Sequence, residues 1–493
     1  MPWLGVVMGG RKLVVAHNFV PVERDQSFLM PPSMTEWLDE DHLVWLVLEI
    51  VGELDLSGFE AAYRADGRGG QAYDPAMMVG LLVYAYCVGE RSSRRIERLL
   101  VTDVAFRVVA ANQRPDHTTI ARFRAGHQDA VAGLFGQVLA VCAKAGLLAS
   151  GVVAVDGTKL AASASMGANR TAKQLAAEIL AQAEAVDAVE DAAEAAATQG
   201  QPVADPGLGR RGAARRERVR QVLAQLEAEA EERSYDEHMR RRAVVEAETG
   251  RKLPGNPPSP DSAMFKSREL GNLTDPDSRL LKCRKGWLQG YNVQAVANEA
   301  QVVVAAQATN DAVDTAWFVP MMEQTVENLA GLEGAVQVRQ SLADAGYWAV
   351  GNTEFAGMEV LVSPSQAHKL GKLTQREQDR CLVLARLEAG EISKDEAGTL
   401  IGVGRSRLNH ILRLRAENGD HTLTATMMAR LGTPQGRADY KRRKAIIEPV
   451  FGQIKHCRGI RQLARRGLAA ADSEWKLICT AHNILKIHKT RLT

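Results

Sequence analysis

The sequence predicts a mixed α/β protein with a helical N-terminal region, and three observations support this fold class. Short apolar strands alternate with helical patterns from residue 151 onward. Two of these strands run directly into a carboxylate, at Asp156 and at Asp344. Before them, Asp25–Leu148 shows the apolar periodicity and the capping residues of successive helices.

The composition is typical of a globular protein and excludes several other classes. The 493 residues leave room for about two to four domains. No apolar run reaches the roughly 18–20 residues of a membrane span, and the N-terminal charges follow the apolar part instead of preceding it. The six cysteines have no paired spacing, which argues against a zinc site or disulfides and fits a reducing compartment. We therefore expect a cytoplasmic protein without a membrane partner.

The first candidate site residue is Asp156, in the stretch GVVAVDGTKL. We expect a short buried strand over Gly151–Val155 that ends at this carboxylate. A carboxylate at the tip of an apolar strand is costly to bury alone, so it usually has a charge partner or a metal. Gly157 then allows close backbone approach to a ligand. A structural cap or turn aspartate is the alternative interpretation.

Two further acidic residues repeat this pattern. Asp344 ends the apolar stretch VQVRQSLAD, and Glu448 lies in an apolar helical pattern, with Lys455 two helical turns later on the same face. Two aspartates and one glutamate can converge on a pair of Mg²⁺ ions, which sit about 3.5–4 Å apart in phosphoryl-transfer sites. Hard divalent ions prefer such oxygen ligands to histidine or cysteine.

At these motifs the chain resembles a known family. VVAVDGTKL, LADAGYW and IEPVFGQIK resemble, in this order, the DDE transposases of bacterial insertion sequences, in the branch with a Tyr-Arg-Glu-Lys signature. The resemblance also covers Asp25–Arg124 and Thr274–Asp311. It implies an RNase H-like catalytic core in which Asp156, Asp344 and Glu448 are catalytic and bind the metal. The implied cofactor is Mg²⁺ or Mn²⁺, as two ions.

The signature residues around the third acid match the family unevenly. Lys455 matches the family's lysine by its spacing from the glutamate, so the resemblance makes it catalytic. The family pattern places Arg four and Tyr seven positions before the glutamate, where this chain has Lys444 and Lys441. Tyr440 and Arg443 each stand one residue earlier. We carry over Tyr440 and Arg443 as DNA-binding residues, with Lys444 as the alternative to the arginine.

Arginines cluster on two predicted helices of the N-terminal region. Arg94 and Arg95 lie in ERSSRRIERLL, and Arg122 and Arg124 lie in TTIARFR. They form either a solvated helical face or a set of phosphate contacts. In the resembled family this region recognises the terminal inverted repeats, which favours DNA binding.

Two insertions interrupt the predicted core. The first, about Ala168–Leu270, is Ala/Glu-rich and predicts two antiparallel helices followed by the linker LPGNPPSPDS. It is either a solvated spacer or an arm for dimerisation or DNA clamping. The second, about Ser365–Arg437, resembles a helix-turn-helix with its turn at Gly402. Arg405 and Arg407 would then face DNA, although any short helical hairpin has a similar pattern.

Between the insertions we predict a β-hairpin. Its strands are Tyr291–Ala297 and Gln301–Ala308, and Asn292 and Gln294 share one face as core polar residues or as part of the active cleft. The predicted domains are an N-terminal tail (1–24), a helical DNA-binding domain (25–148), an RNase H-like core (149–167, 271–364 and 438–493) and two helical insertions (168–270 and 365–437).

The resemblance implies a transposase that cuts and joins DNA at the ends of its own element. Its partners would be double-stranded DNA, both element ends and target, and a second copy of the chain on that DNA. Two other classes stay open: an RNase H-like nuclease that cuts without joining, and a non-catalytic DNA-binding protein derived from a transposase.

Overall fold

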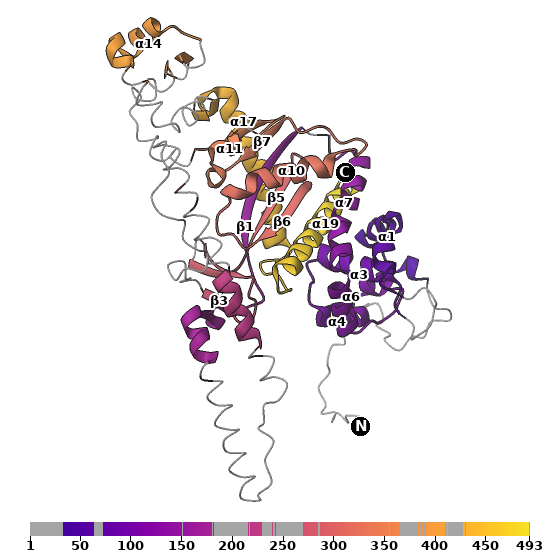
Figure 1. Ribbon diagram of the computed structural model, residues 1–493. Coiled ribbons are helices and arrows are strands. Elements are labelled where there is room, and N and C mark those ends of the chain that lie inside the picture. The colour runs from indigo at the N-terminus through magenta and orange to yellow at the C-terminus, as the bar shows by residue number, and fades with distance from the viewer. Residues whose placement is uncertain are drawn as a thin grey trace, which may run out of the picture. The chain divides into compact units, whose positions relative to one another are not determined.

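The computed structural model describes most of the predicted core (Figure 1). The described residues are 33–63, 72–149, 151–179, 217–228, 270–283, 286–353, 355–364, 391–409 and 430–492, with single positions at 181, 215, 239, 242, 383–384, 386–387, 412 and 427–428. The predicted N-terminal tail, the predicted linker and most of both insertions lie outside the described residues. None of the described helices combines the length and apolarity that crossing a membrane requires.

The chain divides into two compact units, residues 1–39 and residues 40–493. In the first unit the described part contains the short 3₁₀-helix η1 (Met34–Glu36), and the Ser33 hydroxyl accepts a hydrogen bond from the Thr35 N–H. The second unit contains all the other helices and strands of the described residues.

Helices make up the N-terminal part of this unit. They are α1 (Leu43–Glu53), α2 (Ser57–Glu60), α3 (Pro75–Cys87), α4 (Ser93–Thr102), α5 (Val104–Val109), α6 (His117–Gly126) and α7 (Gln128–Lys144). Asp74, Asp103 and Asp116 cap α3, α5 and α6 by accepting a backbone N–H in the first turn. The middle of α3 is buried on all sides, as its almost wholly apolar sequence predicts.

A mixed sheet forms the centre of the fold. Its strands are β1 (Val152–Ala161), β4 (Arg279–Cys283), β5 (Gly286–Asn298), β6 (Val303–Thr309), β7 (Gln340–Ala343) and β8 (Glu359–Val362). The order is β4-β5-β1-β7-β8, with β6 also paired to β5. β1, β5 and β6 are antiparallel, whereas β1, β7 and β8 are parallel. This arrangement is compatible with an RNase H-like core and confirms the predicted hairpin.

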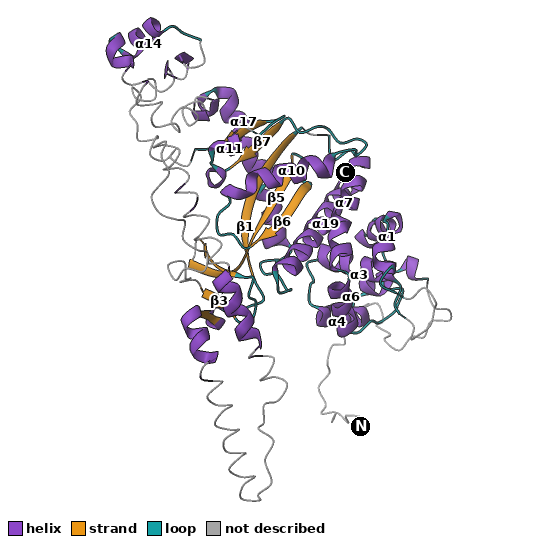
Figure 2. Cartoon of the chain, in the orientation of Figure 1, coloured by secondary structure: helices purple, strands orange, loops and turns teal. Residues whose placement is uncertain are grey.

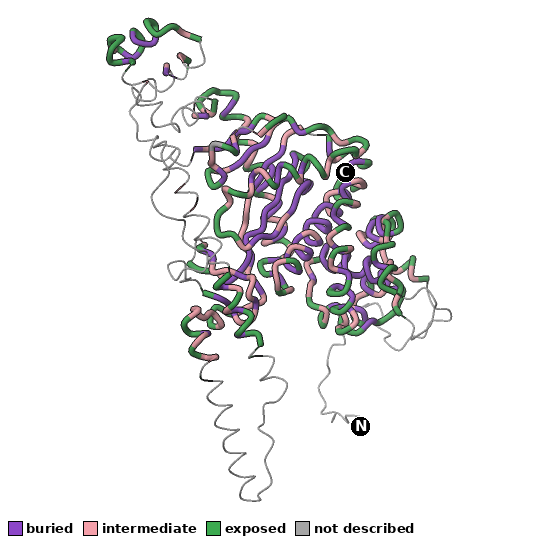
Figure 3. The backbone as a smooth tube through the Cα atoms, viewed as in Figure 1, coloured by how far each residue is buried: buried purple, intermediate pink, exposed green. Residues whose placement is uncertain are grey.

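The remaining helices pack around the sheet (Figure 2). They are η4 (Thr315–Trp317), α10 (Phe318–Leu329), η5 (Ala345–Tyr347), α11 (Val350–Thr353), α17 (Pro434–Ile446), α18 (Glu448–Gly452), the π-helix η6 (Gln453–Cys457) and α19 (Leu468–Leu492). α19 contacts β6, α3 and α7, so it joins the sheet to the N-terminal helices. Figure 3 draws most of β5, β6 and α19 as buried.

Side chains from the helices close the edge of β6. The Val303 N–H donates to Asn483 Oδ1 at 2.8 Å, and the Ala308 N–H donates to Asp472 Oδ1 at 2.7 Å. The Ala306 N–H donates to Gln324 on α10 at 3.1 Å. An edge strand presents unpaired backbone groups. These contacts therefore give hydrogen-bond partners to buried N–H groups that would otherwise have none.

The first insertion leaves and re-enters the core at one short ribbon. β2 (Asn169–Thr171) follows the 3₁₀-turn η2 (Met166–Ala168) and pairs with β3 (Leu270–Asn272) in antiparallel fashion. Helical residues 172–179 and 217–228 pack beside the ribbon, and their shared core consists of Leu175, Val219, Val222 and Leu226. These described segments fit the predicted pair of helices.

The described part of the second insertion has its own small core. α14 (Lys394–Ile401) begins at a capping box between Ser393 and Glu396 and ends at Gly402, which has a φ of 69°. The predicted turn at Gly402 is therefore confirmed. Residues 405–409 are helical again, with Leu408 buried against Ala397 and Ile401.

A buried carboxylate on α19 fastens the N-terminal helices to the core. The Glu474 side chain has no exposed surface and accepts hydrogen bonds from the Ala464 and Arg465 N–H groups and from the Tyr86 hydroxyl. Arg91 lies 3.7 Å away, and Arg124 donates to the Tyr86 hydroxyl. Burial is tolerable because each oxygen of Glu474 has partners.

We predict that Glu474→Ala destabilises the protein by about 3–5 kcal/mol, because it leaves buried donors and Arg91 without their acceptor. Glu49→Ala is the matched control. Glu49 is half-exposed and pairs with Arg491 at 2.6 and 2.8 Å, and an exposed ion pair contributes about 0–1 kcal/mol. Denaturant unfolding of both variants measures the difference, and equal losses would contradict the role given to Glu474.

Candidate active site

Two neighbouring parallel strands bring Asp156 and Asp344 close together. β1 and β7 pair from Val152↔Gln340 to Ala154↔Leu342. Each aspartate lies two residues beyond this last pair, so the parallel register places the two residues next to each other. The Asp344 carboxylate also accepts the Gly346 N–H at 2.8 Å, which fixes the turn that follows β7.

The predicted end of the first strand at Asp156 is wrong. β1 continues to Ala161, because β5 is long enough to pair with it throughout, with Asp156 opposite Ala295. Only the β7 neighbour stops before Asp156. The carboxylate therefore lies at an opening inside the sheet, where β1 has a partner on one side alone.

Arg443 connects the third acid to the first. Its Nη1 lies 3.5 Å from Asp156 Oδ2, and its Nη2 lies 3.5 Å from Glu448 Oε1. The Arg443 side chain is only 12% exposed, whereas that of Glu448 is 52% exposed. The guanidinium therefore stands between two of the three acids as a buried positive charge.

The predicted helical setting of Glu448 is confirmed, with one interruption at Ile447 that the sequence pattern did not indicate. α17 ends at Ile446, the buried Ile447 forms a turn, and Glu448 is the first residue of α18. Arg443 and Glu448 lie on either side of this turn and pair although five positions separate them in the sequence. Tyr440 hydrogen-bonds to Arg443 and Ser363, and burial raises its pKa.

Lys455 lies against β1, on the same face of the strand as Asp156. Its ammonium donates to the Thr158 hydroxyl and, at 2.9 Å, to the Lys159 carbonyl. Thr158 is two residues after Asp156 and so lies on the same face of the strand. Burial lowers the pKa of Lys455. Lys455 lies in the π-helix η6.

Burial and neighbouring charges perturb Asp156 strongly. Burial is the main cause that raises its pKa to about 7, and Asp344 raises it further. Arg443 and the Gly157 N–H oppose this effect, and a third carboxylate, Asp314, adds to it. A carboxylate whose pKa is perturbed by burial together with specific neighbouring charges is typical of a functional site.

Comparison with protein families finds transposase domains at both ends of the chain. Residues 32–126 match a transposase domain (DUF772), and residues 405–488 match a transposase DDE domain. Together they indicate a DDE transposase. A search of curated proteins found no match, and a search of solved structures found none either.

The two matches cover different parts of the chain. The DUF772 match spans α1–α6, and the DDE match spans α17–α19 with Glu448 and Lys455. Asp156 and Asp344 lie between the two matched stretches. Their association with Glu448 therefore depends on the geometry given above, and the Tyr-Arg-Glu-Lys branch depends on the sequence resemblance.

The sequence-predicted DNA-binding arginines differ in accessibility. Arg94, Arg95 and Arg122 are exposed on α4 and α6. Arg124 is buried and donates to the Tyr86 hydroxyl and the Arg91 carbonyl, each at 3.0 Å, so it has a packing role. Lys444, Arg405 and Arg407 are exposed. Within the described part of the chain, none of these seven side chains forms an ion pair with the three acids.

The sequence analysis missed Asp314, on the loop between β6 and η4. Its Oδ1 accepts hydrogen bonds from Asn292 at 2.8 Å and from Gln294 at 2.7 Å. The two amides share a face of β5, as predicted, and they line the acidic site. The stretch NDAVDT after a strand was the available signal, although it is also an ordinary helix start.

The donor set suits a hard divalent cation, but the side chains are not arranged as ligands. In the described ranges, no group of three or more Asp, Glu, His or Cys side chains is placed so that it could hold a metal ion. Arg443 occupies the space between Asp156 and Glu448 with a positive charge of its own. Burial and the neighbouring carboxylates raise the pKa of Asp156, and a bound cation would offset both effects by favouring the ionised form.

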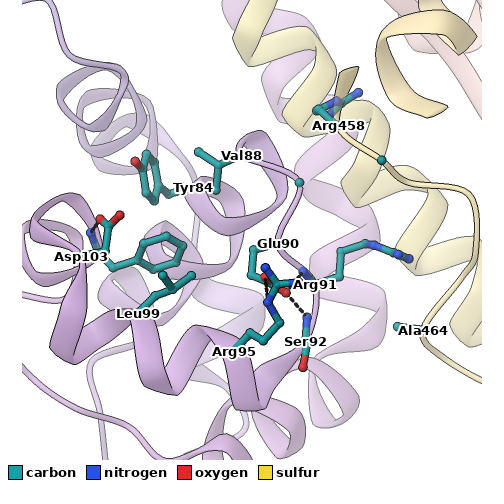
Figure 4. Close-up of a pocket in the computed structure, with 13 residues that line it drawn as sticks. Tyr84, Val88, Glu90, Arg91, Ser92, Arg95, Leu99, Asp103, Arg458 and Ala464 are labelled. Carbon is teal, nitrogen blue, oxygen red and sulfur yellow. Dashed lines mark hydrogen bonds and ion pairs between the residues drawn. The ribbon is translucent and has the colours of Figure 1, made fainter. Parts of the chain in front are cut away.

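A cavity of about 630 Å³ lies apart from the acids, between α3–α5 and the segment after η6 (Figure 4). Glu90, Arg95 and Arg458 are among the charged residues that line it. Arg95 pairs with Glu90 at 2.8 Å, and the turn at Gly89 approaches the Arg458 backbone closely. None of the three acids lines this cavity, so we assign it to the joint between the N-terminal helices and the core.

We predict that Asp156→Asn stabilises the metal-free protein increasingly as pH rises from about 4 to 7. With its pKa raised to about 7, Asp156 binds its proton more tightly in the folded state, so ionisation costs stability in this window. The shift corresponds to a gain of at most about 4 kcal/mol above pH 7. Thermal unfolding with a chelator present, at several pH values, measures it.

Asp116→Asn provides a control of opposite sign. The hydrogen bond from the Thr119 N–H lowers the pKa of Asp116, so wild type gains stability over this variant as pH rises through the acid range. If the stability difference between Asp156→Asn and wild type does not change with pH, the environment described for Asp156 is incorrect.

Proposed function

We propose that the chain binds the terminal inverted repeats of its own insertion sequence and catalyses metal-dependent DNA cleavage and strand transfer. One observation carries the proposal. The β1–β7 register sets Asp156 beside Asp344, and Arg443 joins Asp156 to Glu448 at 3.5 Å on each side. Three acids from distant parts of the chain are thus linked, two by the strand register and the third through Arg443.

In this proposal Asp156, Asp344 and Glu448 hold Mg²⁺ or Mn²⁺, as two ions. Bound there, the ions would supply activation of the attacking oxygen and neutralisation of the leaving oxygen in an in-line phosphoryl transfer. Water is the attacking group in cleavage, and the freed 3′-OH is the attacking group in joining. The protein's own contribution is positioning and charge stabilisation, without a covalent protein intermediate.

The basic residues around the acids grip the DNA backbone. Lys455, held beside Thr158, lies where it can contact the phosphate next to the scissile bond. If these carboxylates held a cation, Arg443 would lose them as partners and its guanidinium would be available for a phosphate. Tyr440 lies beside Arg443 and can contact the DNA end, and the exposed Lys444 adds charge on the same helix.

DNA contacts farther from the acids come from two helical regions. We propose Arg94, Arg95 and Arg122 on the N-terminal helices, and Arg405 and Arg407 on the segment after Gly402. All five are exposed, and such contacts make affinity steeply dependent on salt. We leave out Arg124 because it is buried. Two element ends have to be held together, so the active form on DNA is a homodimer.

We predict that Asp156→Asn, Asp344→Asn and Glu448→Gln each bind a labelled duplex carrying the element's end but cut it at least 100-fold more slowly. The reason is the loss of a charge that holds the cation, while the DNA-binding surfaces stay intact. The measurement is release of a 3′-OH end and its joining to a second DNA, with Mg²⁺ or Mn²⁺.

Glu359→Gln is the matched control. Glu359 is an exposed carboxylate at the start of the neighbouring strand β8, so this variant should cut at the wild-type rate. Cutting without joining by wild type would favour the nuclease alternative. Binding without any cutting would favour the non-catalytic DNA-binding alternative. Full activity in any one of the three acid variants would remove that acid from the site.

A further inference from the structure

Asp314 lies where three elements of the site meet, although no motif marks it. It follows β6 and precedes η4, and its Oδ1 takes two hydrogen bonds from the amides of Asn292 and Gln294 on β5. Both amides are buried, with 1% and 0% of their surface exposed. Hydrogen bonds to a charged acceptor are the stronger kind, so the position of this carboxylate is well fixed.

Two glycines leave the space that Asp314 occupies. A Cβ at Gly157 would lie 2.5 Å from Asp314 Oδ1, and a Cβ at Gly346 would lie 3.3 Å from Asp314 Oδ2. Gly157 directly follows Asp156, and Gly346 is two residues after Asp344. The Asp314 carboxylate is therefore wedged between the backbone segments that carry the two aspartates, and a side chain at Gly157 would exclude it.

A chain of hydrogen bonds ties the Asp314 loop to the turn that carries Asp344. The Thr315 hydroxyl donates to the Gly346 carbonyl at 2.8 Å, and Asn352 donates to the carbonyls of Thr315 and Tyr347 at 2.8 Å each. The buried Tyr347 hydroxyl donates to Gln294, which itself donates to Asp314. The network closes on itself, so it resists relative movement of β5, the loop and the turn.

This third carboxylate has an electrostatic cost in the absence of a cation. It lies close enough to Asp156 and Tyr347 to raise the pKa of both. An asparagine at this position would keep the acceptor for both amides and remove the repulsion. An unfavourable charge in a rigid setting is typical of a group kept for function.

We propose that Asp314 is a positioning residue of the active site, which fixes the separation of Asp156 and Asp344 and strengthens their hold on a divalent cation. Its rigid carboxylate fixes the positions of the backbone segments at Gly157 and Gly346. Its negative charge lies next to the two proposed metal ligands without binding the metal itself. Mutation of residues that contact metal ligands without binding the metal typically lowers metal affinity or activity by about 10–100-fold. The inference rests on the proposed function, in which Asp156 and Asp344 bind the ions.

The test is Mn²⁺ binding to the full-length protein, measured by calorimetry and by electron paramagnetic resonance, for wild type and Asp314→Asn. We expect Asp314→Asn to bind Mn²⁺ at least about 10-fold more weakly. Its unfolding temperature should equal or exceed that of wild type, because a repulsive charge is gone. Half-maximal cleavage should require proportionally more Mn²⁺, with a rate at saturation within about threefold of wild type.

Two further variants distinguish the effect of the position of Asp314 from the effect of any negative charge near the site. Asp311→Asn removes an exposed carboxylate from the same loop, where it accepts a hydrogen bond from Trp317, and should leave Mn²⁺ affinity unchanged. Gly157→Ala removes no charge but places a methyl group against Asp314, and should weaken Mn²⁺ binding. Wild-type affinity in Gly157→Ala would overturn the positioning role.

The remaining outcomes distinguish this inference from the proposed function. If wild type binds Mn²⁺ and Asp314→Asn binds it equally well, the role of Asp314 is overturned and the triad stands. If Asp311→Asn weakens binding as much as Asp314→Asn, the special position of Asp314 is overturned. If wild type binds no Mn²⁺, both the proposed function and this inference fall.

Discussion

The site depends on the burial of one carboxylate, Asp156, inside the sheet beside two others. Burial and the charges of Asp344 and Asp314 disfavour its ionised form, and Arg443 compensates only in part. The surroundings follow from this constraint. Carboxylate oxygens lie close to where a Cβ would be at Gly157 and Gly346, and amides on β5 donate hydrogen bonds to Asp314. A divalent cation would compensate the remaining negative charge of these carboxylates, whereas the guanidinium alone does not.

The fold assembles this site from segments that are far apart in the sequence and leaves room for large insertions. β1, β7 and α17–α18 converge because β1 is central in the sheet, with an antiparallel neighbour on one side and a parallel one on the other. The first insertion begins and ends at the β2–β3 ribbon, so it adds residues without separating β1 from β5. α19 contributes Glu474 to the joint with the N-terminal helices and Asn483 to the edge of β6. The same helix thus stabilises both the sheet and the connection to the region matched as a transposase domain.

Sequence patterns predicted the features that depend on local periodicity and residue type. The apolar α3, the hairpin and the turn at Gly402 follow from such patterns. The extent of β1 could not be predicted from its own sequence pattern, because only pairing with the long strand β5 keeps it in the sheet beyond Asp156. The break at Ile447 could not be predicted either, since a buried isoleucine is also typical of a helix interior. Tertiary contacts that leave no local sequence pattern also determine the positions of Arg124 and Asp314. Such contacts bury Arg124, and they place Asp314 in the site. The catalytic role of the triad remains a proposal that geometry and resemblance support together.

The central claim is that Asp156, Asp344 and Glu448 bind divalent cations in place of the contact with Arg443. Anomalous diffraction from crystals of the protein with Mn²⁺ and an element-end duplex tests it most directly. The account predicts Mn²⁺ peaks at about 2 Å from oxygens of all three acids, with Arg443 turned away from Asp156 and toward the DNA. Mn²⁺ bound elsewhere, with Arg443 still between Asp156 and Glu448, would contradict it.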